Sequence, residues 1–146
     1  MIVIVDANIL FSAIISPNGA IAEIIGHPSS PARLMSGHYC FVELFKHQQK
    51  ILKFSKRTET ETLDILYSLV SYIEFYNETL IEQVHWQQAE LLTQDVDCFD
   101  VNYVALALQT GGWLWTGDRK LANHLRSLGF DQVVDTAELY ARLEIG

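Results

Sequence analysis

The chain has 146 residues, of which 49% are hydrophobic and 19% charged, and its formal net charge is −8. This length and composition predict one globular domain over residues 1–146 with a sizeable core, and they exclude a disordered chain. The acidic charge argues against a non-specific polyanion binder, and no apolar run approaches the ~18 residues of a membrane span. Two cysteines far apart in the sequence, Cys40 and Cys98, are typical of buried thiols in a cytoplasmic protein.

The first half of the chain predicts two strands among short helices. The continuous β-branched run at its start is typical of a buried strand, and Ser16–Gly19 is a helix breaker. The elements expected here are a strand at 2–5, helices at 8–15 and 20–26, a loop at 26–37, a strand at 38–42 and a helix at 43–56.

The second half continues the alternation of strands and helices. Thr58 and Glu61 form a capping-box pattern, and apolar residues recur at i, i+3, i+4 and i+7 from Val101. The elements expected here are helices at 59–70, 77–92, 101–109, 119–128 and 136–143, and strands at 72–76, 113–115 and 132–134. Such an alternation predicts an α/β fold with a parallel sheet covered on both faces.

Acidic residues stand where predicted strands end and helices begin. Asp6 and Asp118 each follow an apolar strand, Glu43 follows the strand predicted at 38–42, and Asp100 opens a helix. Ligands of open α/β sheets bind outside the carboxyl ends of the strands, so we expect these acids to share one cleft. Each close pair would repel by about 4 kcal/mol at an effective dielectric near 20. A divalent cation is the ordinary way to hold such a cluster together.

Each acid also has a purely structural interpretation. Asp6, Asp100 and Asp118 stand where a helix N-cap is expected, and Glu43 stands where a first-turn glutamate favours the helix dipole. A capping role and metal binding are compatible, because both use an oxygen at a helix start. Asp95 lies in the same acidic loop as Asp100, and we expect its side chain to be solvated.

Oxygen ligands of this kind indicate Mg²⁺ or Mn²⁺ and not zinc, which prefers cysteine and histidine. The five histidines show no ligand spacing, and the sequence has no nucleophile elbow, phosphate loop or Ser–His–Asp order. Metal ions held by carboxylates, without a protein nucleophile, indicate hydrolysis by activated water. Two-metal phosphodiester cleavage is the best-known case.

Three sequence motifs resemble those of the PIN-domain ribonucleases. IVDANILFSAII at 4–15 is similar to the family's first motif, and DCFDVNYVALAL at 97–108 is similar to its third acidic motif. LWTGDRKL at 114–121 resembles the last motif, and ELFKH at 43–47 lies where the family places its glutamate. The likeness spans nearly the whole chain, in the right order.

The resemblance implies a three-layer α/β/α sandwich with a central parallel sheet of four to five strands. It also implies an enzyme that binds Mg²⁺ or Mn²⁺, cuts RNA and, like many small members, dimerises and pairs with an antitoxin protein. The implied catalytic residues are Asp6, Glu43, Asp100 and Asp118, with Asp6, Asp100 and Asp118 as metal ligands and Asn8, Asp97 and Thr116 in support. Either Asp97 or Asp100 is the third ligand, and we prefer Asp100 because it directly opens the apolar helix.

The basic residues gather in two places. Four lysines recur at i, i+4, i+7 and i+10, which is one face of a helix that begins near Glu43. This face is either a solvated surface or a track for the RNA backbone. Two further cations directly follow Asp118 and either hold the scissile phosphate or lie free on the surface. The candidate RNA-binding residues are Lys46, Lys50, Lys53, Arg119 and Lys120.

The sequence thus predicts a metal-dependent endoribonuclease, the toxin of a toxin–antitoxin pair. One alternative is a degenerate PIN-like domain that binds RNA or protein without catalysis. Another is a haloacid-dehalogenase-like phosphatase, which needs a second aspartate two residues after the first, where this chain has Asn8. A receiver-like phospho-acceptor module would want an acidic neighbour of Asp6, and the preceding residue is Val5.

Overall fold

A five-stranded parallel sheet forms the centre of the computed structural model, which describes residues 1–96 and 100–144. The sheet order is β3-β2-β1-β4-β5, so the first strand lies in the middle and pairs with β2 on one side and β4 on the other. The chain therefore winds outward in two directions from β1, and the crevice at such a switch point is where ligands bind. The strands are β1 (Ile2–Val5), β2 (Arg33–Gly37), β3 (Glu74–Tyr76), β4 (Trp113–Trp115) and β5 (Val133–Val134).

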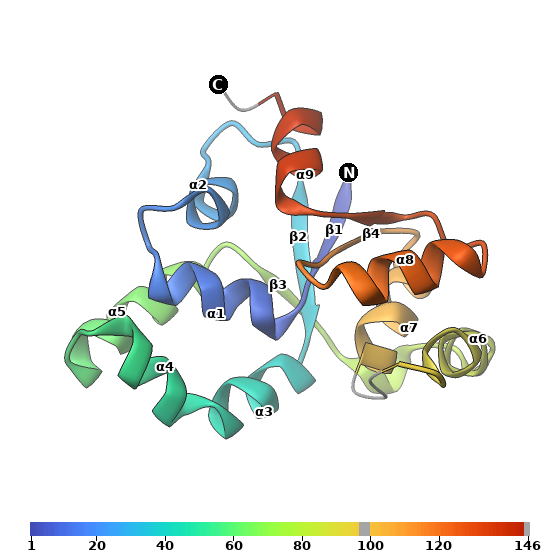
Figure 1. The fold of residues 1–146 in the computed structure, drawn as a ribbon, viewed down its shortest axis with the longest axis horizontal. Helices are drawn as coiled ribbons and strands as arrows, with labels where there is room; N and C mark the ends of the chain where they lie inside the picture. The colour runs from blue at the N-terminus through green and yellow to red at the C-terminus, as the bar shows by residue number, and fades with distance from the viewer. Residues whose placement is uncertain (97–99, 145–146) are drawn as a thin grey trace.

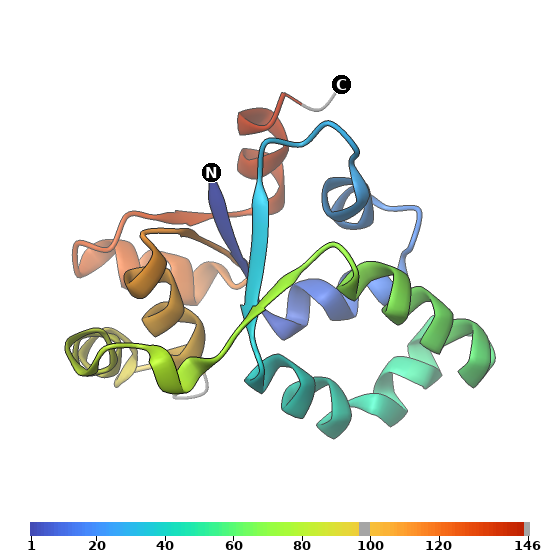
Figure 2. The same ribbon diagram turned by 180° about the vertical axis from the view of Figure 1, so that it is seen from behind.

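Helices surround this sheet in two groups. In both views α1 to α5 lie on one side of the central strands and α6 to α8 on the other (Figures 1 and 2). The helices are α1 (Ala7–Ile15), α2 (Ala20–Gly26), α3 (Tyr39–Lys46), α4 (Gln48–Ser55), α5 (Glu59–Val70), the 3₁₀ turn η1 (Glu78–Leu80), α6 (Gln83–Thr93), α7 (Val101–Thr110), α8 (Arg119–Ser127) and α9 (Thr136–Arg142). Within the described ranges no single helix is long and apolar enough to span a membrane. Helices α1 and α2 have the required length and apolarity only when they are taken together, and a 109° bend separates them.

Alternating side chains of the central strand pack into two separate hydrophobic cores. Val3 and Val5 pack into a cluster with α1, α2, α5 and α9, whereas Ile4 packs into a second cluster with α6, α7 and α8. Successive side chains of a strand point to opposite faces of its sheet, so both faces of β1 are buried. The predicted three-layer α/β/α sandwich with a parallel sheet is therefore confirmed.

The prediction of a loop at 26–37 and a strand at 38–42 was wrong. The second strand is β2, and residues 39–46 form α3 instead. The aromatic and β-branched residues of this segment favour a strand, but Cys40 and Leu44, four residues apart, are buried on one helical face. The backbone N–H of Tyr39 donates to Glu78 Oε1 at 2.9 Å, so a residue distant in sequence stabilises the start of this helix.

Two predicted long helices are also interrupted. The helix expected at 43–56 breaks at His47 between α3 and α4, and Lys56 ends α4 in a left-handed conformation with φ 56°. The helix expected from Asn77 is the short turn η1, which Asn77 caps, followed by the separate helix α6. By contrast, Thr58 caps α5 as predicted, because Thr58 Oγ1 accepts from the Glu61 N–H at 3.1 Å.

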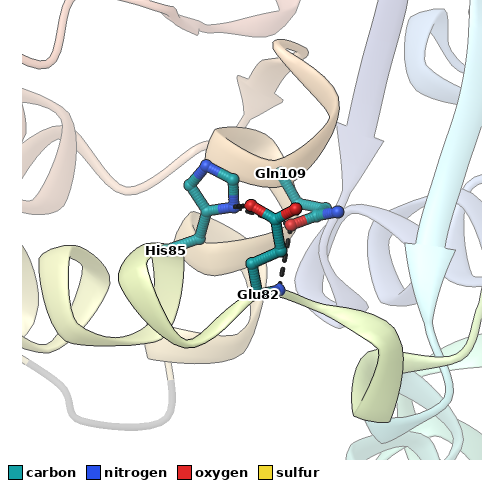
Figure 3. Close-up of polar contacts among 3 residues, drawn as sticks. All are labelled: Glu82, His85 and Gln109. Atoms are coloured by element: carbon teal, nitrogen blue, oxygen red, sulfur yellow. Dashed lines mark hydrogen bonds and ion pairs between the residues drawn. The ribbon is translucent and has the colours of Figure 1, made fainter.

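The start of α6 is fixed by a side chain of α7, against which it packs. Gln109 Oε1 lies 2.6 Å from His85 Nδ1 and accepts from the Glu82 N–H at 3.0 Å (Figure 3). The carboxylate of Glu82 lies 3.9 Å from the same histidine nitrogen. The Glu82 N–H, which has no acceptor within its own helix, thus donates to a side chain of the neighbouring helix.

Candidate active site

Asp6 is a buried carboxyl group at the carboxyl end of the central strand. It directly follows β1 and is only 5% exposed. Its backbone is extended, and its Oδ1 accepts from the Ile9 N–H at 2.9 Å, which makes Asp6 the N-cap of α1. The capping interpretation of Asp6 is therefore correct, but a cap does not require burial.

Burial and a second acid perturb this group strongly. The pKa of Asp6 is raised to about 7, chiefly by desolvation and in part by the negative charge of Glu43, against the lowering effects of the Ile9 N–H and the Thr116 side chain. A carboxyl group that has lost its water favours the neutral form unless a cation is nearby. Asp6 and Glu43 therefore form an acidic pair at one site, as the sequence predicted, although Glu43 lies within α3 and not at a strand end.

Tyr103 connects this acidic pair to the backbone. Its hydroxyl donates to Glu43 Oε1 at 2.5 Å and accepts from the Ala7 N–H at 3.3 Å. The residue is 3% exposed, and its burial beside acidic groups raises the pKa of the phenol far above its ordinary value, so the group stays a donor. Sequence reasoning gave Tyr103 no role, because its contact with Glu43 joins residues that lie 60 positions apart.

Thr116 joins Asp6 to Asp118. The Thr116 side chain hydrogen-bonds the Asp6 carboxyl group, and Thr116 Oγ1 accepts from the Asp118 N–H at 3.1 Å. Asp118 follows β4 and caps α8, because its Oδ1 accepts from the Leu121 N–H at 3.1 Å. Unlike Asp6, the side chain of Asp118 is exposed. Thr116 thus lies between the two aspartates, and its supporting role at the site stays a prediction.

Glu78 is a further acid at this edge that sequence reasoning missed. It follows β3 and lies so close to Gly37 that a Cβ there would come within 2.5 Å of Glu78 Cδ. Its charge, with those of Asp6 and Glu43, adds to the burial that raises the pKa of the Cys40 thiol to about 12. Acids that follow β1 and β3, together with Glu43 of α3, therefore surround one buried thiol.

Two of the remaining predicted site residues stand at helix starts. Asp100 takes the N-cap position of α7, one turn before Tyr103, and Asn8 is an exposed residue in the first turn of α1. Asp97 and Cys98 lie outside the described residues, so the choice between Asp97 and Asp100 stays a prediction. Asp95 is exposed, as expected.

The lysines do not share one continuous helix. Lys46 ends α3, whereas Lys50 and Lys53 belong to α4, and the break at His47 removes the single register that their spacing implied. All three are exposed, as are Arg119 and Lys120 at the start of α8. Their role toward RNA stays a prediction.

The chemistry of the donor set fits a divalent cation, but the geometry is not that of a preformed cage. Within residues 1–96 and 100–144, no three side chains of the His, Cys, Asp and Glu types lie close enough together to hold a metal ion. The carboxyl oxygens of Asp6 and Glu43 are nevertheless the hard ligands that Mg²⁺ and Mn²⁺ prefer. A cation there would offset the penalty that now raises the pKa of Asp6.

Comparisons with known proteins agree with this architecture. A family model described as a PIN domain matches residues 4–133. A solved structure of VapBC2 from Rickettsia felis, bound to a DNA fragment from their promoter, contains a similar chain with a TM-score of 0.70. The match covers 92% of this chain and 98% of that one at 14% identity, a level at which the likeness concerns the fold. No curated protein matches the chain.

Proposed function

The chain belongs to the PIN-domain family, and we propose that it is a metal-dependent endoribonuclease that serves as the toxin of a toxin–antitoxin pair. PIN domains are generally nucleases that depend on divalent metal ions. The single observation that carries the proposal is Asp6, a carboxyl group buried at the end of the central strand and electrostatically coupled to Glu43. Burying a carboxyl group beside a second acid disfavours its ionised form, and a helix cap requires neither the burial nor the second acid.

Each residue of the centre has a distinct part in phosphodiester hydrolysis. Asp6, Asp100 and Asp118 do not form a preformed cage, so their side chains would have to converge to hold Mg²⁺ or Mn²⁺. The metal would supply an activated water and stabilise charge on the scissile phosphate. Tyr103 fixes Glu43 by donating to its Oε1, so Oε2 would accept the proton that the attacking water loses. Arg119 and Lys120, at the start of α8 directly after Asp118, would hold the RNA backbone.

An exposed apolar surface over α3 to α5 is consistent with a bound protein partner. An apolar groove of about 350 Å³ lies between α1, α3, α4 and α5, and its lining includes Phe41, Phe45 and Leu63. Phe45 is 72% exposed and Leu63 is 54% exposed. Soluble monomers seldom expose a contiguous apolar surface, and such a surface commonly marks a protein interface. We propose that the cognate antitoxin or a second copy of the chain covers this surface.

A cleavage assay tests the proposal directly. The purified protein is incubated with a panel of single-stranded and structured RNAs in Mg²⁺, in Mn²⁺ and in EDTA, and the products are mapped. We expect internal cleavage with either metal and none with EDTA. Absence of cleavage in every condition, by protein shown to be folded, would favour the degenerate binding domain. Release of inorganic phosphate from phosphomonoesters without RNA cleavage would favour the phosphatase.

A further inference from the structure

A polar pocket opens beside the acidic centre, on the side of β4 and β5. Its volume is about 460 Å³, and it lies between the beginnings of α8 and α9, which are neighbours in the fold (Figure 1). Thr116, Gly117 and Asp118 form one wall, and these residues also border the acidic centre. A pocket of this size is within the range of small-ligand sites, so a bound group would lie next to the scissile phosphate.

The side chains of the pocket are arranged as donors beside acceptors. Arg126 Nη2 donates to the Val133 carbonyl at 3.0 Å and lies 3.5 Å from Glu138 Oε2, so the backbone fixes this Arg–Glu pair. Asn123 lines the pocket one helical turn before Arg126, and Arg119 lies a further turn away. Asp135 Oδ1 accepts from the Glu138 N–H at 2.8 Å, which fixes the backbone that carries Glu138.

We propose that this pocket binds a guanine base of the RNA, on the nucleotide next to the scissile phosphate. The proposal rests on the ribonuclease function proposed above. Bases of single-stranded RNA are read by hydrogen bonds to their Watson–Crick and Hoogsteen edges. The Watson–Crick edge of guanine presents one acceptor, O6, beside two donors, N1–H and N2–H₂. That order matches a guanidinium beside a carboxylate, which are the groups of Arg126 and Glu138.

The balance of charge in the pocket also favours guanine. Three carboxylates line it, from Asp118, Asp135 and Glu138, against the two guanidiniums of Arg119 and Arg126. An acceptor-rich lining suits a base edge with two donors better than the edges of cytosine or uracil, which carry one donor each. A bare phosphate is disfavoured for the same reason, because the carboxylates would repel it.

The test compares a variant of the pocket with a matched variant at the opposite end of the sheet. Glu138→Gln keeps the size of the side chain but replaces one acceptor by a donor, whereas Glu74→Gln breaks the Arg33–Glu74 pair at 2.9 Å, far from the pocket. Cleavage is measured on RNAs that differ only in the nucleotide flanking the cut. We expect wild type and Glu74→Gln to prefer guanine, and Glu138→Gln to lose roughly tenfold of that preference, the scale of one bidentate base contact.

A binding measurement separates the pocket from the nuclease proposal. The four nucleoside 5′-monophosphates are titrated in EDTA while the side-chain amide resonance of Asn123 is followed by NMR. We expect GMP to shift this resonance more than AMP, CMP or UMP does, and to lose that effect in Glu138→Gln. Equal responses to all four nucleotides, or a guanine preference unchanged in Glu138→Gln, would overturn the pocket assignment. A protein that cleaves no RNA but binds GMP in this way would refute only the nuclease function.

Discussion

Replacing Asp6 by asparagine should stabilise the metal-free protein at alkaline pH. The pKa of Asp6 is raised from its ordinary value of 3.8 to about 7, because the folded state disfavours the ionised group. The unfolded chain therefore releases this proton at a lower pH, and the stability of the fold decreases as pH rises from about 4 to about 7. At 1.36 kcal/mol per pH unit, the cost above pH 7 is about 4 kcal/mol.

Asparagine removes this cost and still caps α1, because its side-chain oxygen accepts from the Ile9 N–H as aspartate does. We expect Asp6→Asn to raise the free energy of unfolding by about 4 kcal/mol at pH 8 and by about 2 kcal/mol at pH 5. Urea unfolding in EDTA, followed by tryptophan fluorescence at both pH values, measures these differences. Asp118→Asn is the matched control, since Asp118 caps α8 in the same way but is exposed, and we expect no comparable gain. A less stable Asp6→Asn protein at pH 8, or a gain that does not depend on pH, would refute this reasoning.

Three further predictions concern the metal, the tyrosine and the lysines. Mg²⁺ or Mn²⁺ at a hundredfold excess over its dissociation constant should stabilise the fold by about 2.7 kcal/mol relative to EDTA, and the gain should be smaller in Asp118→Asn. Melting temperatures that neither metal changes would count against the site. Tyr103→Phe should lower the free energy of unfolding by about 1–3 kcal/mol in urea, because the Ala7 N–H loses its acceptor, whereas Tyr140→Phe at the surface should change little. A triple lysine-to-glutamine variant should bind RNA more weakly, with a log–log salt slope lower by roughly 0.7 per lost contact; an unchanged slope would make these lysines a solvated surface. Its positions are Lys46, Lys50 and Lys53.

The sequence was sufficient where local signals and burial agree. The continuous apolar run at the start of the chain predicted β1 with its observed bounds, and the Thr58 capping box predicted the start of α5. Asp6 and Asp118 are candidates from the sequence because Asp6 directly follows an apolar strand and Asp118 stands three residues after another, a pattern visible along the chain. In these segments hydrophobic pattern, cap and tertiary position favour the same structure.

The failures come from contacts between residues distant in sequence. The start of α3 depends on Glu78, whose side chain accepts a hydrogen bond from the Tyr39 N–H. The two residues lie 39 positions apart in the sequence. Similarly, Tyr103 reaches Glu43 across 60 residues of sequence, so its spacing could not reveal its place in the site. The lysines were predicted to share one helical face because no glycine or proline marks the helix break at His47. Single-sequence patterns contain local information only, and these features depend on packing.

RNA cleavage by a set of asparagine variants tests the central claim most directly. We expect Asp6→Asn and Asp118→Asn to stay folded because asparagine caps α1 and α8 about as well as aspartate, and Asp100→Asn to stay folded because the Asp100 side chain makes no cap hydrogen bond. All three variants should lose nearly all cleavage in Mg²⁺ or Mn²⁺. Asp95→Asn, at an exposed position in the same acidic loop as Asp100, should stay active. Cleavage retained only in Asp100→Asn would move the third ligand to Asp97. Full cleavage by a folded Asp6→Asn or Asp118→Asn protein would contradict the proposed nuclease site.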